Sequence, residues 1–309
     1  MWFKNLQIHR MTTPFEITAE ELHQKLAEHA FRPCSSLETF TFGWVPPLGR
    51  HGSQLTHATN GYIMVCARKE EKVLPASVVN EIVAEKVADI EDTQARPVRS
   101  KERKGIREEV LQDLMPRAFS RSNYTFAYID PHNGWLVVDA ANTTKAEDLV
   151  SLLRKAIGQF PTQLPKVNGN PTDILTRWLS QHTPAHNFVI ENQCELRDPD
   201  KEGGVIRCTR QDLMAEEVQS HLQAGKQVTK LAIEWSERLT AILADDLTVK
   251  RLRFLDVVQE EAENSYGDDV ASCFDTDFAL MTLELSRFIP ALIEAFGGLS
   301  NEKITQPNG

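Results

Sequence analysis

The sequence contains no long apolar run. No apolar stretch approaches the roughly 18 to 20 residues that a helix needs to cross a bilayer. The first ten residues, MWFKNLQIHR, place Lys4 where a signal peptide would be entering its apolar stretch. We therefore expect a cytoplasmic protein that makes no membrane contact.

Cysteine is scarce, and its positions form no recognisable motif. The five cysteines are Cys34, Cys66, Cys194, Cys208 and Cys273. No CxxC pair occurs, and an odd number of scattered thiols is more typical of reduced, mostly buried side chains than of a disulfide framework. The sequence gives no support for cysteine-bound zinc, and we expect no metal.

Glycine-rich loops that bind phosphates are also missing. Neither GxGxxG nor GxxxxGK[ST] occurs, and the chain has no GxSxG segment that would mark a serine nucleophile. His182 and His186 are four residues apart, but Pro184 between them favours a loop over a metal-binding helix face. These absences weaken the hypothesis of an enzyme without excluding it, and we expect no catalytic residues and no cofactor.

A pair of carboxylates keeps an enzymatic alternative open. Asp275 and Asp277 occupy alternate positions at the expected start of the last helix. There they could hold a hard cation for phosphodiester cleavage, together with Glu284. Acidic side chains at such a position also complement the helix dipole. A metal-dependent nuclease is therefore the alternative to a non-enzymatic protein.

The composition itself is ordinary for a folded protein. The chain has 309 residues, of which 41% are hydrophobic and 25% are charged. These values exclude collagen-like, low-complexity and wholly disordered classes. At roughly 150 residues per domain, we expect one large domain or two smaller ones.

Charge is unevenly distributed along the chain. The net charge is -10, yet residues 1–155 hold 20 basic and 20 acidic side chains, so the whole deficit lies in the second half. Residues 96–107 carry six basic side chains and one acid, a local balance of +5. Residues 256–277 carry eight acidic side chains and no lysine or arginine. A protein that is acidic overall can therefore still present a local basic surface.

Sequence patterns in the first half predict an α+β fold. A capping box beginning at Thr18 predicts a helix, preceded by a strand over residues 2–10. Helical spacing over residues 77–90 and 106–114, interrupted at Pro97, predicts a helical hairpin with a basic tip. The other expected elements are strands at 39–45, 61–69, 124–129 and 135–140 and a helix at 144–157.

A proline-rich segment at residues 160–171 is the best candidate for a linker. We expect a central α+β domain of residues 1–75 plus 116–160, an inserted helical finger of residues 76–115, and a C-terminal α+β domain of residues 161–309. In that last region we expect strands at 205–209, 228–235, 238–244 and 249–254, a helix at 215–224, and a long helix at 278–296 broken near Pro290.

Binding to nucleic-acid phosphates needs only positive or donor groups, without catalytic geometry. The candidates in the hairpin tip are Arg96, Arg99, Lys101, Arg103, Lys104 and Arg107. Arg117 and Arg121 flank Phe119, which is either a core residue or an exposed anchor that docks into a partner subunit. Alternation in the strand that follows residue 225 predicts that Lys226, Val228 and Lys230 share one face, so that the two lysines project together.

The order of several motifs resembles that of the RdgC family of bacterial recombination-associated proteins. The matching segments include MWFKNL at 1–6, GWVPP at 43–47, CARKEEK at 66–72, PRAFSR at 116–121, KAEDLVSLLRKAIG at 145–158, GGVIR at 203–207, AGKQVTKLAIEW at 224–235 and FDTDFALMT at 274–282. The likeness covers nearly the whole chain.

This resemblance implies a non-enzymatic protein whose horseshoe-shaped monomer closes into a ring-shaped homodimer around double-stranded DNA, with little sequence preference. It also implies a nucleoid-associated role in replication-linked recombination that limits the recombinase RecA. The family's finger falls on residues 76–115, its hydrophobic subunit contact on Phe119, and its other subunit contact near Arg210 and Gln211. A third hypothesis is a protein-interaction regulator of a recombinase that makes no direct DNA contact.

Overall fold

A seven-stranded antiparallel sheet forms the first part of the fold. The computed structural model describes residues 1–200 and 203–300. The strand order is β2-β4-β5-β6-β1-β7, with β3 paired to β4. The strands are β1 (Gln7–Met11), β2 (Phe40–Val45), β3 (Thr56–Thr59), β4 (Tyr62–Val73), β5 (Phe119–Asp130), β6 (Trp135–Val138) and β7 (Thr162–Gln163). Short 3-10 turns, η1 (Gly49–His51) and η2 (Met115–Arg117), lie in the connections.

Two helices, α1 (Ala19–Ala27) and α4 (Thr143–Ile157), cover one face of this sheet. The predicted capping box at the start of α1 is present, because Thr18 accepts from the Glu21 amide while the Glu21 carboxylate accepts from the Thr18 amide. Leu22 and Leu26 of α1 are fully buried together with the apolar face of α4. Burial of these amphipathic faces, more than helix propensity, holds the layer together.

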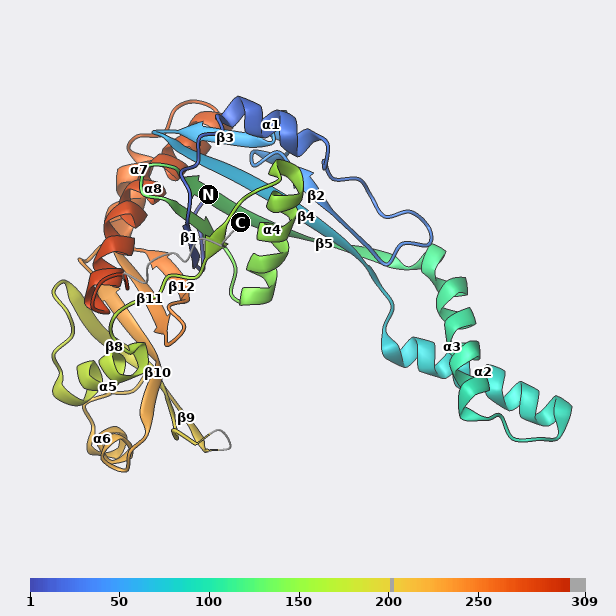
Figure 1. Ribbon diagram of the computed structural model, residues 1–309. Helices are drawn as coiled ribbons and strands as arrows, with labels where there is room; N and C mark the ends of the chain where they lie inside the picture. The colour runs from blue at the N-terminus through green and yellow to red at the C-terminus, as the bar shows by residue number, and fades with distance from the viewer. Residues whose placement is uncertain (201–202, 301–309) are drawn as a thin grey trace, which may run out of the picture.

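The finger is the pair of helices α2 (Ala76–Gln94) and α3 (Ser100–Leu114), inserted between β4 and β5. Figure 1 shows both helices projecting from the far end of these two long strands. Ala95 ends α2 in the left-handed conformation, which turns the chain at the tip. A separate small core, made of Val79, Val83, Ile106 and Val110, joins the two helices.

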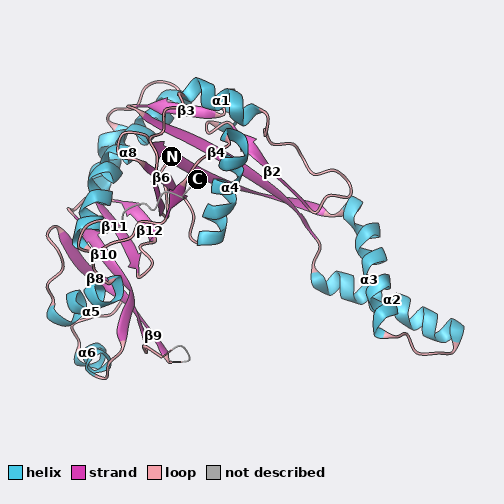
Figure 2. Ribbon diagram, in the orientation of Figure 1, coloured by secondary structure: helices cyan, strands magenta, loops and turns pink. Residues whose placement is uncertain are grey.

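A five-stranded antiparallel sheet forms the second part of the fold, in the order β12-β11-β10-β8-β9. Its strands are β8 (Phe188–Arg197), β9 (Val205–Thr209), β10 (Gln227–Trp235), β11 (Leu239–Ala244) and β12 (Val249–Phe254). The accompanying helices are α5 (Pro171–Gln181), α6 (Glu216–Gln223), α7 (Asp256–Glu263) and α8 (Val270–Ala295). Figure 2 shows this sheet at the opposite end of the molecule from the finger.

The two sheets share one hydrophobic core. Phe3, Leu6 and Ile8 from the amino-terminal segment pack with residues of β8 to β12 and with α5 and α8. Backbone hydrogen bonds in both directions join Leu6 to Val249, with N to O distances of 2.7 and 3.0 Å. The first residues of the chain thus attach the five-stranded sheet to the seven-stranded one.

Most predicted elements of the fold are confirmed, and the exceptions lie mainly in the second half. The prediction that the last helix breaks near Pro290 is wrong, since α8 runs unbroken through it. Phe288, Ile289 and Leu292 around the proline are buried in the shared core. Their packing offsets the hydrogen bond that proline cannot donate.

Five helices and strands were not predicted, namely β3, β7, α5, β8 and α7. Helix α5 starts directly after the proposed linker, because Asn170 caps it and Pro171 occupies its first turn, where a missing N–H is harmless. The linker segment itself contains β7, which pairs with the end of β1 through Met11 and Thr162.

All five cysteines are free, and Cys66, Cys194 and Cys208 are buried. Across residues 1–200 and 203–300, no helix is long and apolar enough to cross a membrane.

The separate core of the finger makes its stability locally testable. Ile106→Ala should lower the free energy of local opening of α2 and α3 by about 2 to 5 kcal/mol, because it leaves a cavity in a cluster of only four buried side chains. Amide hydrogen exchange should show faster exchange in the finger with unchanged protection of the sheets. The control Leu153→Ala, on the buried face of α4, should instead destabilise the seven-stranded sheet and the helices that cover it. Equal loss of protection everywhere in the Ile106 variant would contradict an independent finger core.

Candidate nucleic-acid interface

The tip of the finger brings the predicted basic residues together at the start of α3. All six of its basic side chains are exposed, namely Arg96, Arg99, Lys101, Arg103, Lys104 and Arg107. Helical spacing places Arg103, Lys104 and Arg107 along one side of α3, where they line a groove of about 210 Å³ with Ser100 and Asn80. This groove offers several donors and positive charges to one anionic chain.

The rest of the finger has the opposite charge. Residues 76–115 contain seven basic and nine acidic side chains, and only Glu102 among the acids lies within the basic tip. The single base elsewhere in the finger, Lys86, is 3.3 Å from Asp113. Positive charge is therefore concentrated at the end of the finger that is farthest from the sheets.

The tip cations differ in how free they are. Arg96 forms a two-pronged ion pair with Glu102, with N to O distances of 2.8 and 2.9 Å, which raises the pKa of Arg96 and lowers that of Glu102. Arg107 donates to Asn80 at 2.6 Å. Within the described residues, no carboxylate lies within ion-pair distance of the other four cations, Arg99, Lys101, Arg103 and Lys104.

Phe119 lies at the base of the finger and is 86% exposed, so the interpretation of Phe119 as a core residue is wrong. It is the first residue of β5 and stands opposite Val73, which is also exposed, at the end of β4. Arg117 and Arg121 on either side of it are exposed, and Arg121 stands opposite Glu71. The strands end beyond the covering helices, so the described residues leave this aromatic side chain largely exposed.

Lys230 lies in β10 of the second sheet, and Lys226 directly precedes that strand. Figure 1 shows β10 at the opposite end of the molecule from the finger. The prediction that Lys226, Val228 and Lys230 share a face is wrong, because β10 is irregular between Val228 and Lys230. Val228 points into the core, whereas Lys230 pairs with Glu195 on the other face at 2.9 Å. Lys226 precedes the strand and pairs with Asp198 at 2.6 Å.

Arg210 and Gln211 follow β9, at the far edge of the second sheet. Arg210 has a left-handed backbone (φ 55°) and an exposed side chain. Gln211 is exposed and donates from its side chain to Glu217 at 3.1 Å. Figure 1 shows β9 at the opposite end of the molecule from the finger, at whose base β5 begins with Phe119.

Each of the three carboxylates of the nuclease alternative contacts different partners. Asp275 accepts from His57 at 3.0 Å and from Thr59. Asp277 binds the amino terminus and Tyr266, and burial together with this carboxylate raises the pKa of Tyr266 to about 12.

Glu284 is buried and pairs with Arg238 at 2.7 Å. In the part of the chain that the structure describes, no group of three or more histidine, cysteine or acidic side chains is placed to hold a metal ion. The histidines His182 and His186 lie in the loop between α5 and β8, as predicted.

Three further cations near Lys230, namely Arg207, Lys250 and Arg251, were not predicted from the sequence. For Lys250 and Arg251, the signal was the pattern VKRLRF over 249–254, where charged residues interrupt an apolar strand. Such a pattern is equally typical of any half-exposed strand, so the sequence did not distinguish these cations from ordinary surface residues.

Comparisons with known proteins agree across the whole chain. The family model described as "Putative exonuclease, RdgC" matches residues 1–299. A protein of Aeromonas hydrophila named "Recombination-associated protein RdgC" is 50% identical over 299 residues, which cover 96% of this chain and 98% of the relative. Relatives with the same name from Tolumonas auensis and Pseudomonas aeruginosa are each 46% identical over 96% of this chain, covering 99% and 98% of their own lengths.

The ion pairs of Glu195 predict a pH dependence of stability. Burial of this carboxyl opposes ionisation, but hydrogen bonds from Arg207, Lys230 and Arg197 prevail and lower its pKa from 4.5 to about 2. A lowered pKa in the folded state stabilises the protein above pH 4.5, and that stability is lost as the pH falls toward 2. Glu195→Gln should remove up to about 3 kcal/mol from the unfolding free energy at neutral pH.

The deficit of the Glu195→Gln variant should shrink as the pH falls through this window. Chemical denaturation between pH 7 and pH 2.5 measures it. The control Glu237→Gln, which alters an exposed carboxylate in a turn, should give a curve parallel to that of the unchanged protein. A constant deficit for Glu195→Gln across the range would contradict the prediction.

Proposed function

The chain belongs to the RdgC family of recombination-associated proteins, and we propose that it acts by binding double-stranded DNA through its phosphates, without sequence preference. The observation that supports this most directly is the charge of the finger tip. Residues 96–107 carry six exposed basic side chains and one acidic one, while the rest of the finger is acidic. Phosphates carry no base code, so contacts of this kind fix position on a duplex without selecting a sequence.

We further propose that the protein encloses the duplex as a ring-shaped homodimer. Phe119 supports one subunit contact, because a large aromatic side chain that is 86% exposed beside exposed Val73 suits burial against a second copy. We propose the second contact for Arg210 and Gln211, which follow β9 at the other end of the molecule. A two-fold dimer would double each basic surface, and its acidic remainder would discourage adhesion elsewhere.

A protein that encloses duplex DNA in the nucleoid would limit the access of the recombinase RecA, and we propose this as its role in recombination and replication. We propose binding without cleavage, since Asp275, Asp277 and Glu284 are each held by a different partner. The competing hypothesis, a regulator that touches only the recombinase, makes no use of the basic tip.

Neutralising the finger tip should weaken DNA binding. The variant Lys101→Ala, Arg103→Ala, Lys104→Ala should bind unrelated duplexes less tightly and with a shallower salt dependence. The slope of log affinity against log salt should fall by about 0.9 for each phosphate that the variant no longer neutralises. Fluorescence anisotropy over a salt series measures both quantities. The matched control Lys25→Ala, Arg50→Ala, Arg177→Ala removes the same charge from exposed positions outside the finger and should leave the slope unchanged.

Several outcomes would overturn this proposal. Absence of binding at low salt, or equal slopes in the tip and control variants, would remove the finger as the DNA contact. If the protein shortens the duplex when Mg²⁺ or Mn²⁺ is added, and Asp277→Ala abolishes that cleavage, the result would instead support a nuclease. Undiminished inhibition of recombinase strand exchange by the tip variant would support the protein-interaction regulator.

Phe119→Ser should weaken the dimer by about tenfold or more, since it removes an aromatic anchor from the proposed interface. Sedimentation equilibrium measures the dissociation constant, and DNA affinity should fall with it. The monomer should melt at an unchanged temperature, because the side chain is 86% exposed. Val257→Ser, an exposed apolar residue of α7, is the control. Equal dimer dissociation constants in the two variants would remove Phe119 from the interface.

A further inference from the structure

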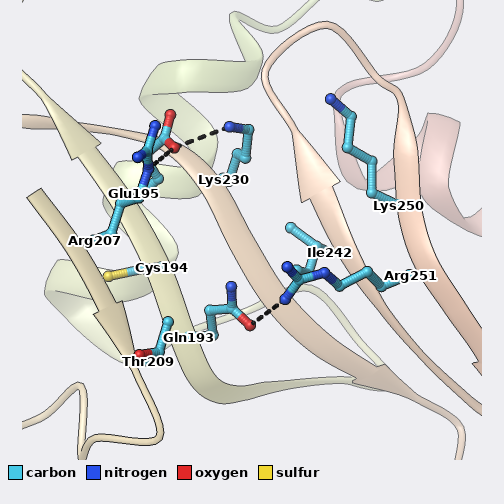
Figure 3. A pocket seen from close by; sticks show the side chains of 9 residues that line it. All are labelled: Gln193, Cys194, Glu195, Arg207, Thr209, Lys230, Ile242, Lys250 and Arg251. Carbon is cyan, nitrogen blue, oxygen red and sulfur yellow. Dashed lines mark hydrogen bonds and ion pairs between the residues drawn. The ribbon is translucent and has the colours of Figure 1, made fainter. Parts of the chain in front are cut away.

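The open face of the five-stranded sheet carries a second concentration of positive charge. The other face of this sheet packs against α5 and α8 in the shared core. On the open face, a pocket of about 450 Å³ is lined by four basic side chains, Arg207, Lys230, Lys250 and Arg251, and by one acid, Glu195. Figure 3 shows these side chains around the pocket, from strands β8, β9, β10 and β12.

Irregularities in two strands direct three of these cations onto the open face. In β10, Val228 and Leu231 are both buried, and the bulge between them turns Lys230 outward. In β12, Val249 and Leu252 are both buried, so the consecutive residues Lys250 and Arg251 both line the pocket.

The turn at Arg251 uses a left-handed backbone conformation (φ 51°). For a residue other than glycine this conformation is strained, because the Cβ atom crowds the following carbonyl oxygen. Bulges and strained residues of this kind concentrate where a protein redirects side chains toward a ligand. The same strands could have buried their apolar residues by plain alternation, without presenting two adjacent cations.

Glu195 organises the centre of the pocket. Its carboxylate is almost fully buried and accepts from Arg207, Lys230 and Arg197, each at 2.9 Å. These contacts hold the cationic groups in place, yet the Arg207 side chain remains 70% exposed. Arg251 is steadied by Gln193 at 3.3 Å, a neutral partner that leaves its charge uncompensated. Four cations against one carboxylate leave a local balance of +3.

We propose that this open face is a second phosphate-binding surface, which contacts the backbone of duplex DNA through Arg207, Lys230, Lys250 and Arg251. The inference rests on the proposed function. Its cations extend from β9 to β12, the two edges of the sheet, across four strand spacings or about 19 Å. A duplex strand presents a phosphate for every 3.4 Å or so of helix rise, so a surface of this width meets several phosphates, whereas a single small anion would engage only part of it.

The test compares two double variants of equal charge change. Lys250→Ala, Arg251→Ala removes two cations that have no carboxylate partner among the described residues, and Lys25→Ala, Arg177→Ala is the control at exposed sites on other surfaces. In the full-length protein, the first variant should lower the salt slope for duplex binding by about 1 to 2, and the control should not change it. Thermal melting of both variants checks that the fold is retained.

The outcomes separate this inference from the proposed function. A shallower slope in the finger variant, with unchanged slope in Lys250→Ala, Arg251→Ala, would overturn the second surface alone. Absence of duplex binding by the unchanged protein would overturn both. A third outcome is that inorganic phosphate displaces only the binding that depends on Lys250 and Arg251, at concentrations that do not weaken the binding that depends on the finger. That result would indicate a small-anion site and would overturn the assignment to a DNA backbone. Reduced slope in both variants, with additive effects when they are combined, is the expected result.

Discussion

The long pairing of β4 with β5 is the constraint on which the rest of the structure depends. Eleven residue pairs run in unbroken register from Ile63 and Ile129 to Val73 and Phe119. At about 3.4 Å per residue, these twelve-residue strands span about 40 Å. One end of the ladder is buried in the cores, and the other extends beyond them to support the finger. The pairing thus fixes the distance at which the basic tip stands from the body.

The positions of the basic residues matter more for the proposed function than the net charge of the protein. The protein is acidic overall, yet its cations are concentrated at the finger tip and on the open face of the second sheet. At both places some cations are held by a carboxylate, Glu102 at the tip and Glu195 on the sheet, while others have none within reach in the described residues. The paired cations keep their neighbours in position, and the unpaired ones remain free to meet phosphates.

The two basic surfaces lie at opposite ends of the molecule, since the finger and the five-stranded sheet lie at its two ends (Figure 1). Phe119 begins β5 at the base of the finger, and Arg210 follows β9 in the other sheet. An exposed aromatic side chain at one end and an exposed charged turn at the other give the proposed homodimer two separate contact sites, which is what closing two subunits into a ring requires. The proposed ring would therefore combine both basic surfaces around one enclosed duplex. Within one chain, the backbone hydrogen bonds between Leu6 and Val249 attach the second sheet to the first.

The sequence by itself determined the local features of this protein. The Thr18 capping box, the helical hairpin and the cluster of six cations at its tip depend on residues close together in the chain, so periodicity and spacing predicted them. Tertiary structure decided what those residues meet. The bulges that turn Lys230 and Arg251 outward, the unbroken helix through Pro290 and the exposure of Phe119 depend on which distant residues pack beside them. The same holds for the carboxylates Asp275, Asp277 and Glu284. Each pairs with a group from another part of the chain. Partners that are remote in sequence leave no local pattern to recognise.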